Sequence, residues 1–281
     1  MMEKEVIKII KKLFEPVNES LELLKTIDNK LDIQASSKLR GQLETLELLT
    51  SSKKKDQTSF KICLVNLNES TEYYKSLTDQ AIKDYRGIYG KHKLKHFLSG
   101  ALKSYLKLGR KAAQKPVLCF ARVLDYSCLW CLSEAGAIIC LAKLKFDSKI
   151  IEERERRLAD AFVNVCDLIE DQAGEMAILA SVLDSLTYKD RLPKNKKRPY
   201  TLSDRLAVKM VPYLLGKNTA FSLLTGFANL KALMPLMPDC SQYPELEDLK
   251  YSLPDVHIAN NAFEYDLESR WRNFLAASKQ R

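Results

Sequence analysis

An apolar segment in the middle of the chain, residues 117–144, constrains the fold more than any other feature. It is apolar on nearly all sides of a helix, as expected for the centre of a bundle or a membrane span. Its longest stretch, residues 126–142, contains Glu134 and is shorter than the roughly 20 residues that cross a bilayer. A charge at the bilayer centre costs about 2.5 to 3.5 kcal/mol, so we predict a buried central helix. Within it, Arg122 and Asp125 are three residues apart and can pair.

Most other segments have one apolar face. Apolar residues recur at intervals of three and four, as in amphipathic helices, while nine glycines and nine prolines among 281 residues leave little turn chemistry for a sheet protein. The predicted helices span residues 3–31, 37–49, 56–89, 149–187, 219–233 and 261–278. We predict an all-α fold: an elongated multi-helix bundle around the central apolar helix, with a smaller C-terminal helical portion.

The predicted domain boundaries follow the prolines and the charges. Residues 1–188 form the helical bundle, and residues 189–200 are a basic linker with two prolines. Residues 201–281 form the C-terminal portion, which ends in an amphipathic helix. A short import-like motif lies in the linker at Lys194, Lys196, Lys197 and Arg198.

Positive charge is concentrated in the segment from Lys83 to Lys115, which has ten Lys or Arg residues against one acid. Its amphipathic part covers residues 91–114, after which Pro116 fits the first position of the next helix. Helical spacing leaves the bases on one broad surface. This predicted anion-binding surface consists of Lys91, Lys93, Lys95, Lys103, Lys107, Arg110 and Lys111.

Three interpretations of this basic surface stay open. The acidic stretch 239–268 carries eight acids against one base and can neutralise it within the protein. Alternatively, the basic surface contacts anionic lipid headgroups or the phosphates of a nucleic acid. A second predicted contact surface is the apolar face of the last helix, which can dock a partner or close the core. It comprises Phe263, Leu267, Trp271 and Phe274.

Candidate catalytic groups are few. Cys128 and Cys131, with Cys119 and Cys140 nearby, lie in the apolar helix rather than on polar turns, so we interpret them as core residues and not as zinc or redox ligands. The pair His92 and His96 lies among lysines that repel a cation. The D-x-x-x-D spacing of Asp167 and Asp171 suits a magnesium diphosphate site, but a second acidic motif is missing. We predict no metal and no cofactor.

The sequence therefore favours a soluble, non-enzymatic interaction or adaptor protein with coiled-coil-like helical surfaces. A protein partner is expected, and no small-molecule substrate is inferred. The alternatives are a peripheral membrane protein that binds anionic lipids through its basic helix, a helical nucleic-acid-binding protein, and a magnesium-dependent helical enzyme using Asp167 and Asp171. The odd count of seven cysteines and the charged N-terminus, without a signal peptide, predict an intracellular location, cytoplasmic or nuclear.

Overall fold

The described part of the chain is almost entirely helical. The computed structural model describes residues 7–10, 13, 17, 20–22, 25, 33–52, 56–90, 110–170, 217–239, 241–243 and 246. Its helices are α2 (Ile33–Ser51), α3 (Gln57–Gly90), α5 (Arg110–Lys143), α6 (Ser148–Glu170), α9 (Lys217–Leu233) and the 3-10 turn η1 (Met234–Leu236). These residues contain no β-strand, which confirms the predicted all-α class.

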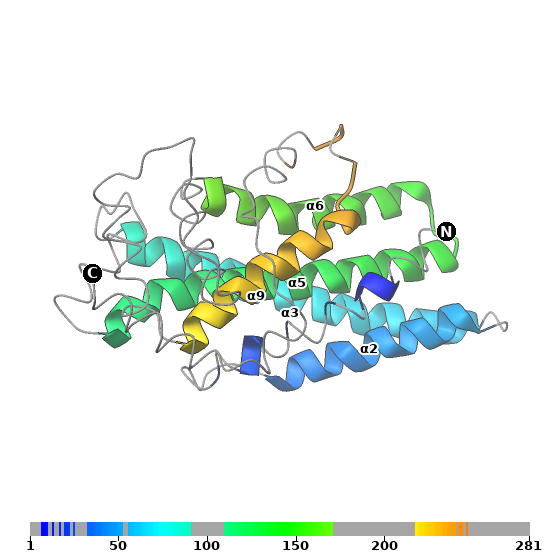
Figure 1. Cartoon of the computed structure of the whole chain (residues 1–281). Helices are drawn as coiled ribbons and strands as arrows, with labels where there is room; N and C mark the ends of the chain where they lie inside the picture. The colour runs from blue at the N-terminus through cyan, green and yellow to red at the C-terminus, as the bar shows by residue number, and fades with distance from the viewer. Residues whose placement is uncertain are drawn as a thin grey trace, which may run out of the picture.

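Helix α5 is the centre of the bundle. Helices α3, α6 and α9 all pack against it, and α2 lies along α3 (Figure 1). By length and composition α5 is the one described helix apolar enough to cross a membrane, yet 89% of its most apolar window is buried by the protein itself. Trp130 and Phe120 are among its largest fully buried side chains. The predicted buried central helix is confirmed.

Helix α3 is the longest partner of α5. Its 34 residues correspond to about 51 Å at 1.5 Å per residue, which gives the bundle its elongated shape (Figure 1). Asp56 begins the helix as an N-cap, because its Oδ1 accepts the backbone N–H of Thr58 at 3.0 Å. The apolar residues that recur at helical spacing along this helix, including Phe60, Leu67 and Tyr74, are buried.

The predicted start of the central helix was wrong. Pro116 does not open it; α5 begins six residues earlier, at Arg110, and continues through the proline. A proline inside a helix removes one backbone hydrogen bond. Burial of the residues that follow, beginning with Val117 and Phe120 at 0% exposure, offsets that cost. The start of α2 was also wrong, since the helix begins at Ile33 and not at residue 37.

A tight turn reverses the chain between α5 and α6. Lys145 has a φ of 58°, in the left-handed region that ends many helices, and Phe146 N–H donates to the Leu141 carbonyl at 3.1 Å. Asp147 then begins α6 by accepting the N–H of Lys149 at 2.9 Å. The two helices therefore run antiparallel, and α6 lies back along α5 (Figure 1).

Two glycines should respond in opposite ways to substitution by alanine. A Cβ at Gly226 in α9 would lie 2.9 Å from Leu124 Cβ in α5, whereas a Cβ at Gly41 in α2 would meet nothing within 4 Å. We expect Gly226→Ala to lower the free energy of unfolding by about 1 to 3 kcal/mol through overpacking. Gly41→Ala should raise it by about 0.5 to 1 kcal/mol because alanine favours the helix. Urea denaturation followed by circular dichroism measures both; equal effects would contradict the close approach of α9 to α5.

Candidate functional site

A buried carboxylate joins α5 to α6. Glu134 of α5 has a side chain with 0% exposure; its Oε2 lies 2.9 Å from Arg154 Nη1 and its Oε1 lies 2.8 Å from Arg157 Nε. The indole Nε1 of Trp130, one turn earlier, also donates to Oε1 at 3.4 Å. One carboxylate therefore accepts hydrogen bonds from two arginines of α6 and from its own helix.

The same two arginines reach α3. Arg154 donates to Asn68 Oδ1, and Arg157 pairs with Glu72. Burial raises the pKa of Glu134, while the charges of Arg154 and Arg157 act in the opposite direction. Two acids and two arginines leave the cluster without net charge. We call these five residues, Asn68, Glu72, Glu134, Arg154 and Arg157, the ionic cluster; it ties three helices together.

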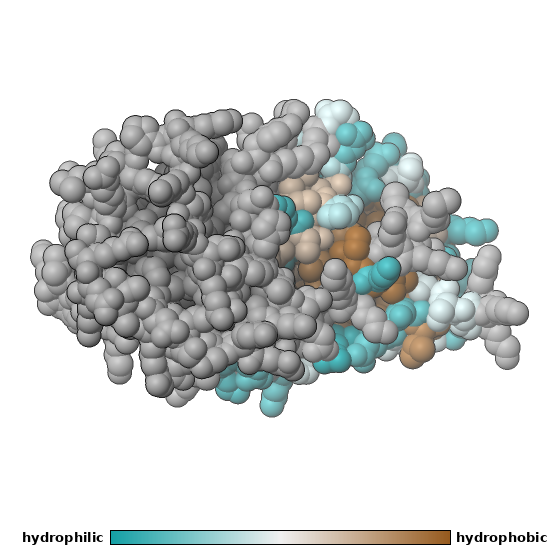
Figure 2. Space-filling view, in the orientation of Figure 1, coloured by the Kyte–Doolittle hydropathy of each residue, from teal (hydrophilic) through white to brown (hydrophobic). Residues whose placement is uncertain are grey.

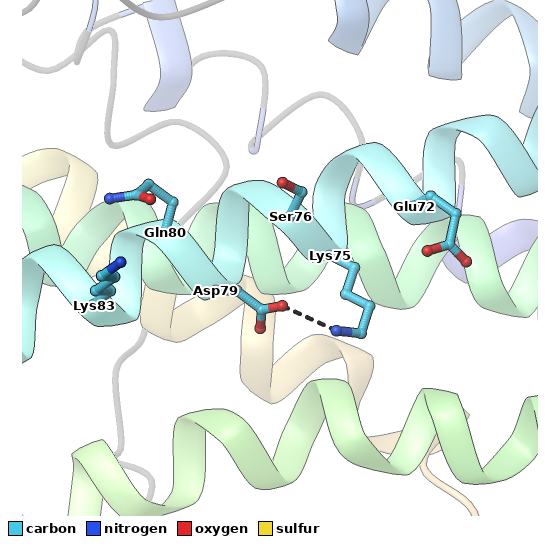
Figure 3. Close-up of a pocket in the computed structure, with 6 residues that line it drawn as sticks. All are labelled: Glu72, Lys75, Ser76, Asp79, Gln80 and Lys83. Carbon is cyan, nitrogen blue, oxygen red and sulfur yellow. Dashed lines mark hydrogen bonds and ion pairs between the residues drawn. The ribbon is translucent and has the colours of Figure 1, made fainter.

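A shallow groove lies beside the ionic cluster on the outer face of α3. Its volume is about 370 Å³, and its described lining residues are Glu72, Lys75, Ser76, Asp79, Gln80 and Lys83. Figure 3 shows Lys75 and Asp79 turned the same way and joined by an ion pair of 2.9 Å. The Lys75 ammonium lies 5.6 Å from the Trp130 ring centroid, within the range of a cation–π contact. Acids and bases alternate along the groove and offer no single charge to a ligand.

The second candidate site is an apolar surface. Leu48, Ile62 and Val65 are exposed by 71%, 59% and 58%, and we call them the α2–α3 apolar stripe. Contiguous exposed apolar patches mark contact surfaces, whereas single exposed apolar residues are common on any protein. Phe146 and Ile150 are also exposed, at the turn between α5 and α6. On the described part of the face in Figure 2, hydrophilic residues border the apolar ones.

The register of α2 and α3 puts the stripe on one side of this helix pair. Lys38 Nζ of α2 lies 3.1 Å from Glu69 Oε2 of α3. Residues three, four or seven apart share a helix face. On α3, Val65 and Ile62 precede Glu69 by four and seven residues. On α2, the exposed Thr45 follows Lys38 by seven residues, and Leu48 follows Thr45 by three. The ion pair and the stripe therefore lie along the same side of the two helices.

A buried polar contact joins α5, α9 and the N-terminal segment. Ser20 Oγ donates to Asp125 Oδ2 at 2.7 Å, and Ser222 Oγ of α9 lies 3.5 Å from the Ser20 carbonyl. Asp125 is 0% exposed, and its Oδ1 has no hydrogen-bond partner among the described residues. Burial raises the pKa of Asp125 well above its usual range. The expected pairing of Asp125 with Arg122 is thus replaced by a long-range bond from Ser20.

The residues predicted for binding fall mainly outside the described part of the chain. This holds for Lys91, Lys93, Lys95, Lys103 and Lys107, for the import-like linker residues, and for Phe263, Leu267, Trp271 and Phe274. Arg110 and Lys111 are the first two residues of α5. Asp167 lies in α6, but Asp171 and the pair His92 and His96 lie outside the described residues. These assignments stay predictions.

The core cysteines are where the sequence predicted. Cys119, Cys128, Cys131 and Cys140 are all buried in α5. Within the residues that the structure describes, no three His, Cys, Asp or Glu side chains gather in a way that can hold a metal ion. Burial raises the pKa of both Cys128 and Cys131, which disfavours the thiolate that metal binding and nucleophilic attack require.

The ionic cluster, the α2–α3 apolar stripe and the contact between Ser20 and Asp125 were not predicted from the sequence. The one available signal was Glu134 itself, a charge inside an apolar helix, since such a residue needs a partner. Comparison with known proteins leads to no assignment: no family model, no curated protein and no solved structure matches this chain.

Proposed function

We propose that this chain is a non-enzymatic helical interaction protein, and that the α2–α3 apolar stripe is its contact surface for another protein. The exposure of Leu48, Ile62 and Val65 carries the proposal. A partner helix with an apolar face can cover such a stripe, because helices recognise one another through side chains at intervals of three and four. Lys38 and Glu69 at its edge add a charged pair that a partner can match.

The groups with the most chemistry support an interaction role over catalysis. Glu134 is bound to two arginines, and Lys75 to Asp79. The thiols of Cys128 and Cys131 are held in their neutral form by burial. A catalytic site needs a general acid, base or nucleophile with access to substrate, whereas these carboxylates and bases are bound in ion pairs and these thiols are buried.

Photo-crosslinking tests the contact surface. A photoreactive amino acid at the exposed Thr45, within the stripe, should give one discrete adduct in cells, and the same probe at Ser76 of the α3 groove should not. Adding Ile62→Lys should reduce the Thr45 adduct about tenfold, as expected for a central contact residue, while the control Gln80→Lys should leave it unchanged. Because Ile62 is 59% exposed, folding should be kept. An adduct that survives Ile62→Lys would contradict the proposal.

The basic segment supports a second candidate, a membrane-surface protein. Ten bases against one acid lie between Lys83 and Lys115, directly before and across the start of α5. Such segments bind anionic lipids with a free energy of about 1 kcal/mol per base near the surface. This proposal concerns the surface of the membrane, since α5 is enclosed by the bundle.

Liposome flotation distinguishes the two candidates. If the basic segment binds lipids, the protein should float with vesicles that contain phosphatidylserine and not with neutral vesicles. Binding should fall as salt screens the charges. Substituting Lys93, Lys95, Lys103 and Lys107 by Gln should abolish flotation. If the protein floats with neither kind of vesicle, the membrane-surface proposal fails and the interaction-protein proposal stands. A salt-sensitive gel shift with RNA would instead favour the nucleic-acid alternative.

A further inference from the structure

The exposed large apolar side chains of the described residues gather toward one end of the bundle. Leu48 lies in the last turn of α2, and Ile62 and Val65 lie in the first three turns of α3. Phe146 and Ile150 flank the start of α6. The junction of α2 with α3 and the junction of α5 with α6 lie at the same end of the bundle (Figure 1). This end therefore presents apolar surface to the solvent.

The contacts between the helices establish that both junctions lie at this end. A Cβ on Gly136 of α5 would lie 3.1 Å from the side chain of Leu67 in α3 and 3.2 Å from that of Leu43 in α2. Next to this level, Arg154 of α6 pairs with Glu134 of α5 at 2.9 Å. From here the helices continue for six to ten residues (154 − 148 and 67 − 57), or about 9 to 15 Å. The four helices therefore terminate at a similar height along the bundle.

Lysines surround the apolar side chains at the junction of α5 with α6. Its exposed lysines and large apolar residues, which we call the α5–α6 turn surface, are Lys143, Lys145, Phe146, Lys149 and Ile150. Phe146 is exposed by 42% and Ile150 by 41%. The acid within this segment, Asp147, accepts the backbone N–H of Lys149 at 2.9 Å and so caps α6. The surface therefore combines a net charge of +2 (3 − 1) with two large apolar side chains.

Lys145 occupies a backbone position that suits glycine. Its φ of 58° lies in the left-handed region, where any side chain larger than that of glycine is strained. Its N–H donates to the Ala142 carbonyl at 3.2 Å, so the residue closes α5 as glycine commonly does at a helix C-terminus. The chain thus carries a lysine where glycine would give a more stable turn. Such a local loss of stability indicates a role outside folding.

We propose that the α5–α6 turn surface binds membranes that contain anionic lipids. The lysines contact the lipid phosphates, while Phe146 and Ile150 enter the boundary between headgroups and acyl chains. Positive charge and buried apolar area together determine how strongly a protein binds an anionic bilayer. A nucleic acid would attract the lysines through its phosphates but would leave the two apolar side chains in water. The composition of the surface therefore favours a lipid partner.

The proposed contact lies at the opposite end of the bundle from the basic segment, residues 83–115. That segment joins the end of α3 to the start of α5. The two helices are antiparallel, because Leu67 faces Gly136 whereas Tyr85 packs on Phe120 with ring centroids 5.3 Å apart. The length of α3, about 50 Å at 1.5 Å per residue, separates the two regions. A probe in the α5–α6 turn therefore reports contact by this surface and not by the basic segment.

Fluorescence quenching by brominated lipids tests the contact directly. In Phe146→Trp, vesicles of phosphatidylserine and brominated phosphatidylcholine should quench the emission that the new indole adds, because bromine on the acyl chains quenches an indole that enters the bilayer. The emission of the wild-type protein, including that of the buried Trp130, is subtracted. Ser76→Trp, at an exposed position of α3, is the matched control and should not be quenched. Vesicles of brominated phosphatidylcholine alone should quench neither variant.

Two single substitutions on α6 measure the contribution of charge. Lys149→Gln should weaken binding to phosphatidylserine vesicles about fivefold, as expected for one base at an anionic lipid surface. Arg156→Gln removes the same charge from an exposed position about two turns further along α6. It should weaken binding much less, because salt screens a charge that lies away from the contact.

Lys145→Gly separates membrane binding from stability. The variant should melt at a higher temperature than the wild type, because glycine adopts the left-handed conformation without strain. It should nevertheless bind phosphatidylserine vesicles about fivefold more weakly, because one base is lost from the surface. Unchanged binding in this variant would mean that Lys145 only closes the helix, contrary to the proposal.

Three further results would overturn the proposal. The first is a wild-type protein that does not bind phosphatidylserine vesicles. The second is bound Phe146→Trp without added quenching, which would assign the membrane contact to another part of the chain. The third is equal weakening by Lys149→Gln and Arg156→Gln, which would indicate attraction by overall charge. Each of these variants changes an exposed residue, and circular dichroism verifies that its helices are kept.

Discussion

The double substitution Arg154→Ala and Arg157→Ala is expected to lower the free energy of unfolding by about 3 to 5 kcal/mol. Both arginines bind Glu134, whose side chain is 0% exposed. Without them the carboxylate stays in the interior with only the distant hydrogen bond from Trp130. A buried charge without its partner is among the most destabilising changes that a protein can undergo.

Replacing the carboxylate of the ionic cluster, in Glu134→Gln, should lower the free energy of unfolding by less than the double arginine substitution does. In Glu134→Gln the side chain stays neutral and the arginines, exposed by 15% and 28%, can turn toward water, Asn68 or Glu72. We expect a loss of about 1 to 2 kcal/mol, in the range for weakened hydrogen bonds. Arg156→Ala, an exposed neighbour on α6, is the matched control and should change stability by less than about 0.5 kcal/mol.

Urea denaturation at neutral pH measures all three variants. The order of their effects is the critical result: the double arginine variant first, Glu134→Gln second and Arg156→Ala last. If Glu134→Gln were the most destabilising of the three, the largest loss of stability would come from unpaired arginines and not from the unpaired buried carboxylate, contrary to this expectation.

Asp125→Asn is the second large expected effect, and it depends on pH. Burial raises the pKa of Asp125 in the folded protein, whereas the unfolded chain titrates near the ordinary value of about 4. Between these two values the folded state holds the proton more tightly, so stability is highest at low pH and falls as pH rises. The fall is up to about 1.4 kcal/mol per pH unit. Asparagine is always neutral, so its contribution should stay constant.

The measurement is the difference in unfolding free energy between Asp125→Asn and the wild type, from pH 4 to pH 8. That difference should move steadily in favour of the variant as pH rises, whatever its value at pH 4. Taking a difference cancels Glu134, whose pKa burial also raises. Asp160→Asn, at an exposed position of α6, controls for the loss of one negative charge. A difference that does not vary with pH would show that Asp125 is solvated.

Most of the described helices and the centre of the fold could be predicted from the sequence, because both depend on local periodicity. The run around Trp130 is apolar on every side, so it had to be enclosed. The buried apolar face of α3, which includes Phe60, Leu67 and Tyr74, repeats over many turns without proline. The bounds of α3 were therefore predicted almost to the residue. The start of α5 could not be predicted in the same way, because proline favours the first turn of a helix whereas here the helix extends six residues before Pro116.

The candidate sites depend on pairings that periodicity does not contain. Glu134 and Arg157 are 23 residues apart (157 − 134), and Ser20 and Asp125 are 105 apart. The packing of the helices in three dimensions decides which faces of two helices come into contact, and the local sequence pattern does not contain that information. The exposure of Leu48 also follows from packing, because the structure turns its neighbour Leu49 toward the core and leaves Leu48 outside.

The central position of α5 has a consequence for synthesis on the ribosome. The helix packs on α3, which is made before it, and on α9, which ends 90 residues later (233 − 143). At about 5 to 20 residues per second, the α9-facing side of α5, including Leu124, waits on the order of 5 to 20 s for its cover. During that interval the nascent chain exposes an apolar face of α5. Binding of chaperones is expected to peak once α5 has emerged and to end when α9 packs against it.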